Sequence, residues 1–351
     1  MAAGEEEQRA AKRRILIDAL ERIGKLKDAD VGACVPSPHT LGYRNKLELA
    51  FGEDGRLGFH AAHDPATLVD VPACAIADPR LSAPLRVVRE ALRDGRLGRR
   101  RGRLVLRASG SRPDVLVGFR DGGEPFDEAP AIAEALAASV PGLCGVVRMI
   151  APPGRRGGTR VETIQGRPFL EEEILGVSYR VPAATFLQVN AAAAEGLAES
   201  VLDEAGRPAR VTELYGGIGA IGLALAARGA TVTIVDADGE AVACGREASL
   251  RAGRSALFVR SDVLPFLRAA GEGPELVIAD PPRTGFGPGV AEALVARRPA
   301  RIALVSCDPA TLARDLARLV ASGYALDRVT PHDLFPQTAH VEAVAWLTRR
   351  G

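Results

Sequence analysis

The spacing of apolar and polar positions changes along the chain. Residues 5–28 carry apolar side chains at the three- and four-residue spacing of an amphipathic helix. From about 31 to 180, short alternating segments are separated by turn signals, and helical stretches interrupt them near 81–93 and 128–139. This second pattern predicts an α+β region with antiparallel strands.

After about residue 185, short apolar strands alternate with helical patterns, which predicts a doubly wound, mainly parallel sheet covered on both faces. The candidate strands are 211–214, 231–235, 256–259, 276–279 and 302–306. A last pair, near 324–331 and 340–347, is too close for a helical crossover and predicts a terminal antiparallel hairpin. We therefore expect three parts: an N-terminal helix packed on the last domain (1–30), a smaller central α+β domain (31–180) and an α/β domain (181–351).

Composition and charge narrow the classes of protein. The chain has 351 residues with 45 Lys+Arg and 44 Asp+Glu, and this balance excludes a wholly basic, histone-like binder. An apolar share of 47% predicts a globular protein, and no apolar run is long enough for a membrane span. The acidic start lacks the apolar core of a secretory signal. Five cysteines at long spacings, without a CxxC pair, favour a reduced, cytoplasmic setting and disfavour a metal site built from cysteines alone.

A glycine motif follows the first predicted strand of the α/β region. Gly217, Gly219 and Gly222 form GxGxxG at the start of a helix, and Asp236 ends the next strand about twenty residues on. Glycine lets the backbone approach a ligand, and a helix N-terminus favours polar or anionic groups. The motif fits a nicotinamide nucleotide, a flavin or S-adenosylmethionine, and a glycine-rich packing turn is the alternative.

Three later segments bring reactive side chains to strand ends. Asp280 begins a stiff Asp-Pro-Pro exit from the fourth strand, at the edge where open α/β sheets bind ligands. Cys307 follows the fifth strand at a helix start, which predicts a lowered thiol pKa and a nucleophile, although most lone cysteines are inert. Glu342 shares a strand face with apolar residues, which predicts a raised pKa and a general base; an edge-strand carboxylate in water is the alternative. For His340 we expect a structural hydrogen bond.

Five segments together resemble the S-adenosylmethionine-dependent RNA (uracil-5-)-methyltransferase family. They are Phe186-Leu-Gln-Val-Asn190, Leu214-Tyr-Gly-Gly-Ile-Gly219, Asp280-Pro-Pro-Arg283, Ser306-Cys-Asp-Pro309 and Phe335-Pro-Gln-Thr-Ala-His-Val-Glu342. The central region is similar at Gly42-Tyr-Arg-Asn-Lys46, Gly58-Phe-His60 and Val69-Asp-Val-Pro-Ala-Cys74. The resemblance implies a class I methyltransferase fold.

The resemblance also implies roles for individual residues. Cys307 matches the family nucleophile and Glu342 the family base, acting on carbon 5 of a uridine through a covalent adduct at carbon 6. The positions that match cofactor-binding ones are Gln188, Tyr215, Gly217, Gly219, Asp236 and Asp280, with Asp262 a less close match.

The sequence also departs from the family. Ala220 stands where many members have a polar residue, so we expect the cofactor to lack a polar partner at this position. We expect no OB-like domain before the catalytic unit. Cys74 matches the last iron–sulfur ligand of some members, but the preceding cysteine trio is missing, so no iron–sulfur cluster is expected.

The implied partner is a transfer or ribosomal RNA. The stretch from Arg96 to Arg112 holds seven arginines and no acid, and Arg99, Arg100 and Arg101 at its centre are predicted to contact phosphates. A solvated basic loop is the alternative. Arg283 is predicted to contact a uracil carbonyl or a phosphate. An RNA cytosine-5 methyltransferase and a non-catalytic RNA-binding protein remain as alternative functions.

Overall fold

The computed structural model describes the chain except residues 1–3, 53–54, 99, 152–158, 270 and 272. It divides into two compact units. The first comprises Met1–Thr40, Ile174–Ser178 and Ala192–Gly351, and the second comprises Leu41–Glu173 and Tyr179–Ala191. Among the helices that the structure describes, none has the length and apolar character needed to cross a membrane.

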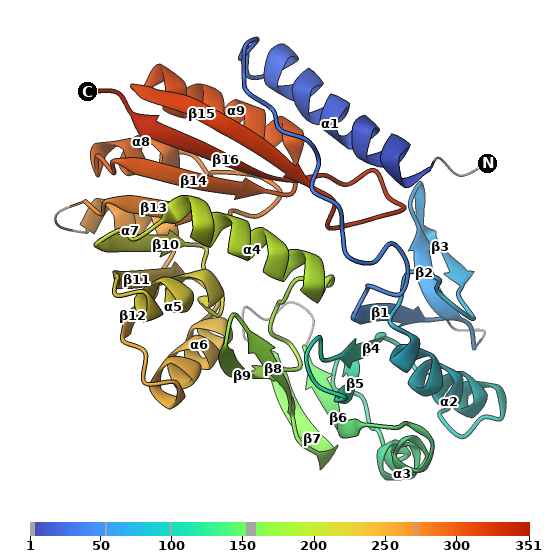
Figure 1. Ribbon diagram of the computed structural model, residues 1–351. Coiled ribbons are helices and arrows are strands. Elements are labelled where there is room, and N and C mark those ends of the chain that lie inside the picture. Colours follow the sequence, from blue (N-terminus) through green and yellow to red (C-terminus); the bar gives the residue numbers. More distant parts are fainter. Residues whose placement is uncertain (1–3, 53–54, 99, 152–158, 270, 272) are drawn as a thin grey trace. The chain divides into compact units, whose positions relative to one another are not determined.

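The first unit is built on a seven-stranded sheet (Figure 1). Its strands are β10 (Arg210–Leu214), β11 (Thr231–Asp236), β12 (Ala256–Arg260), β13 (Leu276–Ala279), β14 (Arg301–Ser306), β15 (Tyr324–His332) and β16 (Glu342–Arg349). Their order is β12-β11-β10-β13-β14-β16-β15, parallel from β12 to β14. β16 lies antiparallel between β14 and β15. The predicted doubly wound sheet with a terminal hairpin is confirmed.

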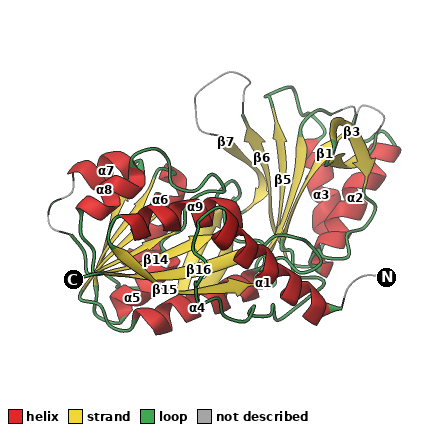
Figure 2. Cartoon of the chain, turned by 90° about the horizontal axis from the view of Figure 1, so that it is seen from above, coloured by secondary structure: helices red, strands yellow, loops and turns green. Residues whose placement is uncertain are grey.

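Helices lie on both sides of this sheet (Figure 2). They are α1 (Glu5–Arg22), α4 (Ala191–Ala205), α5 (Ala220–Ala227), α6 (Gly239–Arg251), α7 (Val263–Ala269), α8 (Val290–Ala296) and α9 (Pro309–Ala321). Leu16 and Leu20 of α1 belong to the same buried cluster as residues of α7, α8, α9 and the central strands. Since the parallel strands end at one edge, the loops that follow them meet there, and these loops carry most of the predicted site residues.

The second unit contains another seven-stranded sheet, ordered β3-β2-β1-β4-β5-β6-β7. Its strands are β1 (Lys46–Phe51), β2 (Leu57–Ala61), β3 (Asp64–Asp70), β4 (Arg103–Ala108), β5 (Val115–Asp121), β6 (Leu143–Ile150) and β7 (Arg160–Gly166). Neighbours are antiparallel except β5 and β6, whose parallel pairing needs the crossover helix α3 (Ala129–Ser139). Apolar residues from one face of this sheet pack with α2 (Ser82–Arg93) and α3. The strands β8 (Phe169–Ile174) and β9 (Val177–Pro182) form a separate ladder.

Candidate active site

The three motif glycines after β10 differ in the space around them: one faces open space and two are closely packed. Gly217 has φ +55°, and a Cβ there would meet nothing within 4 Å. A Cβ at Gly219 would lie 2.6 Å from Ile234 Cδ1, and one at Gly222 would lie 2.4 Å from Glu213 Oε2. Gly217 therefore offers backbone to a ligand, whereas Gly219 and Gly222 allow α5 to pack closely on the sheet.

Three carboxylates gather at this edge of the sheet. Asp236 accepts the backbone N–H groups of Gly217 and Asp238, both at 2.8 Å. Burial, together with Asp280 and Asp236, raises the pKa of Glu213 to about 8. Desolvation and Asp236 raise the pKa of Asp280 to about 6, although solvent reaches its side chain. Because like charges crowd together here, the group as a whole favours a cation.

Tyr215 and Asp262 lie near this group. The Tyr215 ring stacks on Phe286 with a centroid distance of 6.5 Å, and burial raises the pKa of its hydroxyl to about 12, with Asp315 and Asp262 adding to the effect. Asp262 is exposed at the start of α7, and Ala220 is the first residue of α5. Gln188 belongs to the second unit, between β9 and α4.

Cys307 lies between β14 and α9. Its pKa is raised by burial and then by Glu342 and Asp280, while Arg283 opposes the shift. The predicted lowering by the helix N-terminus is wrong, because desolvation and the carboxylates outweigh that end of α9. The helix is also capped by its own acid, Asp308, which accepts Thr311 N–H at 2.9 Å.

Glu342 is the most isolated polar side chain at this edge. It is 1% exposed, and neither carboxylate oxygen has a hydrogen-bond partner among the described residues. Burial and then Asp280 raise its pKa well above the ordinary value, whereas Arg283 lowers it. The edge-strand alternative is excluded, because β16 is paired on both sides. The predicted direction of the pKa shift is confirmed.

Arg283 is the cation beside both reactive groups. Its Nη2 lies 3.2 Å from Nδ1 of His340, and its charge favours the ionised forms of Cys307 and Glu342. His340 thus makes the expected polar contact.

Three residues of α9 that the sequence analysis missed hold the Asp-Pro-Pro loop. Thr311 Oγ1 donates to Arg283 O at 3.1 Å, and Arg314 donates to Thr284 O at 2.8 Å. Asp315, 1% exposed, accepts Phe286 N–H at 2.7 Å. The same helix that follows Cys307 therefore positions Arg283. Polar residues three and four apart, just after the cysteine, were the available signal.

Helix α1 holds the segment that precedes Glu342. Lys12 forms a buried ion pair with Asp333 at 2.5 Å and donates to Phe335 O at 2.9 Å. Gln8 exchanges two hydrogen bonds with Gln337, each at 3.0 Å. Composition and periodicity did not indicate these contacts, because they join positions more than 300 residues apart.

Within the described part of the predicted arginine patch, Arg100 does not lie on the surface. Arg99 lies outside the described residues, and Arg101 is exposed. Arg100 is buried, ion-paired with Asp121 at 2.8 Å and placed 3.5 Å above the Phe126 ring. Its predicted phosphate contact is therefore corrected: an acid distant in sequence already neutralises this guanidinium inside the unit.

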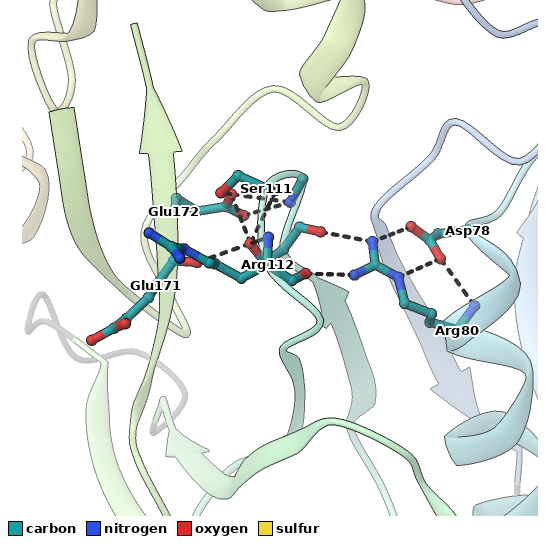
Figure 3. Close-up of polar contacts among 8 residues, drawn as sticks. Asp78, Arg80, Ser111, Arg112, Glu171 and Glu172 are labelled. Carbon is teal, nitrogen blue, oxygen red and sulfur yellow. Dashed lines mark hydrogen bonds and ion pairs between the residues drawn. The ribbon is translucent and has the colours of Figure 1, made fainter. Parts of the chain in front are cut away.

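Arg112, at the end of the same stretch, lies in a tightly held turn (Figure 3). Buried Glu172 accepts Ser109 Oγ and Gly110 N–H, both at 3.0 Å. Arg80 donates to the carbonyl oxygens of Ser109 and Arg112, each at 2.7 Å. The turn between β4 and β5 is thus fixed from two sides.

Comparisons with known proteins show what this chain is similar to. A family model described as tRNA (Uracil-5-)-methyltransferase matches residues 273–350, the range that holds Asp280, Arg283, Cys307 and Glu342. An RNA methyltransferase of Gloeobacter violaceus is 35% identical over 97% of this chain and 78% of its own length. One from Nitratidesulfovibrio vulgaris is 34% identical, covering 98% and 78%. The chain belongs to the RNA (uracil-5-)-methyltransferase family.

A solved structure extends the likeness to both units of this family member. Pyrococcus abyssi tRNA (uracil-54, C5)-methyltransferase, in complex with S-adenosyl-L-homocysteine, is similar with a TM-score of 0.78 at 26% identity. The similarity covers 98% of this chain and 84% of that one. The predicted family and the class I methyltransferase fold are confirmed, and the protein is an RNA methyltransferase.

Proposed function

We propose that this RNA methyltransferase binds S-adenosylmethionine at the glycine loop and methylates carbon 5 of a uridine in transfer or ribosomal RNA. The observation that carries the proposal is the arrangement of Cys307, Arg283 and Glu342 beside Asp280 at one edge of the sheet.

The residues at this edge fit the methyl donor. Gly217 leaves room against the backbone, and Asp236 and Asp280 supply negative charge. Tyr215 and Asp262 are the further proposed contacts in the first unit, and a contact by Gln188 stays a prediction of the family resemblance. When bound, S-adenosylmethionine supplies a methyl group on a sulfonium, whose positive charge suits the carboxylate group.

The proposed covalent chemistry begins at Cys307. Its thiolate adds to carbon 6 of uracil, and the ring electrons move toward carbon 5, which becomes nucleophilic. Carbon 5 would then form a bond to the methyl group as the methyl–sulfur bond of the donor breaks and S-adenosylhomocysteine leaves. Glu342, as carboxylate, then removes the carbon-5 proton, the 5,6 double bond re-forms, and the carbon–sulfur bond breaks to release thiolate. Arg283 favours the thiolate and the carboxylate, the two forms that these steps require.

The test is to incubate mixed transfer and ribosomal RNA with the protein and labelled methyl donor, then identify the nucleosides by mass spectrometry. We expect 5-methyluridine from the native protein and none from Cys307→Ala. Cys34→Ala, a half-buried cysteine elsewhere in the first unit, is the matched control and should retain activity. Glu342→Gln should accumulate a protein–RNA adduct that survives denaturing electrophoresis. Labelled 5-methylcytidine, or full activity in Cys307→Ala, would overturn the proposal.

A further inference from the structure

One face of the sheet in the second unit carries several basic side chains. Alternation along the strands points Leu47, Leu104 and Phe119 into the core beneath α2 and α3. The intervening side chains lie on the other face, and four of them are cationic: Lys46, Arg103, Arg107 and Arg120. The register pairs Lys46 with Arg107, and Arg103 with Arg120. We call these four residues the cationic sheet face.

One carboxylate lies within ion-pair distance of three of these cations. Glu48 lies 3.1 Å from Arg120, 3.5 Å from Arg103 and 4.0 Å from Lys46. Over the part of the chain that the structure describes, it is the one acid within ion-pair distance of those three. Arg120 Nε is buried without a hydrogen-bond partner among the described residues. Positive charge on this face therefore exceeds negative charge.

The pKa of Lys46 reflects both its burial and this excess of positive charge. Its pKa is lowered by burial, and then by Arg107, Arg120 and Arg44, with Glu48 opposing them only in part. The ammonium form is thus disfavoured by neighbours of the same sign, and an anion placed here would relieve the repulsion.

Arg107 fixes one end of the face. It is buried, donates to the carbonyl oxygens of Pro182 and Thr185 at 3.1 and 2.8 Å, and lies near Glu172. Glu172 in turn holds the turn that follows β4 (Figure 3). Buried Arg107 therefore supports the face from within, and the cations of the face that solvent reaches are Arg103, Arg120 and, in smaller part, Lys46.

We propose that Arg103, Arg120 and Lys46 of the cationic sheet face bind the phosphate backbone of the RNA substrate. This replaces the predicted contact of Arg100, whereas the contacts of Arg99 and Arg101 stay predictions. The proposal rests on the RNA methyltransferase assignment but does not depend on the covalent chemistry. Backbone contacts of this kind position the RNA without reading its sequence.

The test compares RNA binding by variants of the cationic sheet face with binding by variants of helix α2, at several salt concentrations. For Lys46→Gln/Arg103→Gln we expect about tenfold or more weaker binding of a transfer RNA transcript. The salt dependence, log K against log[salt], should flatten by about 0.7–0.9 for each phosphate that the variant no longer binds. Arg86→Gln/Arg93→Gln, two exposed cations on α2, is the matched control and should bind as the native protein does.

Further measurements keep the outcome interpretable. Thermal unfolding checks that each variant folds, and Arg103→Gln alone, at a half-exposed position, should already flatten the slope. Lys46→Arg/Arg103→Lys should retain it. An unchanged slope, equal losses in the α2 control, or competition by poly-glutamate as strong as by RNA would each overturn the proposal. Cys307→Ala should bind RNA normally, so a failure of the proposed chemistry is distinguishable.

Discussion

The two sheets concentrate charge of opposite sign. At the carboxyl edge of the first, Glu213, Asp236 and Asp280 crowd together, and the pKa values of Glu213 and Asp280 are raised to about 8 and 6. On the face of the second sheet that points away from α2 and α3, burial and then the surrounding cations lower the pKa of Lys46. In each group burial is the largest cause and charges of the same sign add to it. Each group therefore disfavours its own charge until a partner of opposite sign arrives.

This contrast shows that a net charge of +1 says little about how charge is distributed in the molecule. Balanced totals are compatible with strong local fields, and the two fields suit the two ligands proposed above: the sulfonium of the methyl donor at the glycine loop and the phosphates of RNA on the second sheet. Another buried acid, Asp333, has its cation within the protein, because it forms an ion pair with Lys12. The uncompensated groups are the ones that point to ligands.

The largest effect is expected from removing one charge of the acidic group. Asp280→Asn should weaken binding of S-adenosylmethionine about 10- to 150-fold, since hydrogen bonds to charged groups contribute about 1.5–3 kcal/mol. Isothermal titration calorimetry checks this. S-adenosylhomocysteine, which lacks the sulfonium charge, should lose less affinity.

The pH dependence sharpens the same test. Because the pKa of Asp280 is raised to about 6, its charge is lost as the pH falls through 6. Native affinity for the methyl donor should therefore fall over that interval, and the affinity of Asp280→Asn should change less. Equal affinities of the two proteins at pH 7.5 would contradict a role for this carboxylate.

A smaller effect is expected for stability. The pKa of Glu213 is raised to about 8, so the folded state holds this proton more tightly than the unfolded state does. Native stability should consequently fall as the pH rises from 6 to 8, by at most about 1.4 kcal/mol per pH unit. Glu213→Gln keeps an acceptor for Gly222 N–H and should flatten that slope in denaturant unfolding. An unchanged slope would show that Glu213 is already ionised.

The sequence predicted the first unit better than the second. The strands of the doubly wound sheet followed from short apolar runs, and the site motifs followed from positions just after those strands, where parallel topology brings them together. Cys307, Glu342 and Asp280 could be nominated for that reason. The parallel pair β5 and β6 escaped prediction, because alternation along a strand does not tell which direction its neighbour runs.

Charge environments could not be predicted from neighbours in sequence. Arg100 and Arg103 lie three residues apart, yet one is buried against Asp121 and the other is half exposed on the opposite face. The acids that pair with these two arginines, Asp121 and Glu48, come from other strands that are distant in sequence. For the same reason the sequence predicted the wrong direction for the pKa shift of Cys307, because Glu342 and Asp280 approach this thiol only in the folded chain.

The smallest and most local expected effect concerns Lys46 itself. The chain has only four lysines, so reductive methylation with ¹³C-formaldehyde gives a simple NMR spectrum in which Lys46→Arg identifies the resonance. In the free protein this amine should titrate below its ordinary pKa, because burial and the surrounding arginines disfavour the ammonium. Phosphates on the cationic sheet face would favour the ammonium, so RNA should shift the titration to higher pH, and salt that dissociates the RNA should reverse the shift. If RNA binds and the titration does not move, the positive field of the second sheet is met by something other than phosphate. The opposition between the two sheets would then no longer correspond to two ligands.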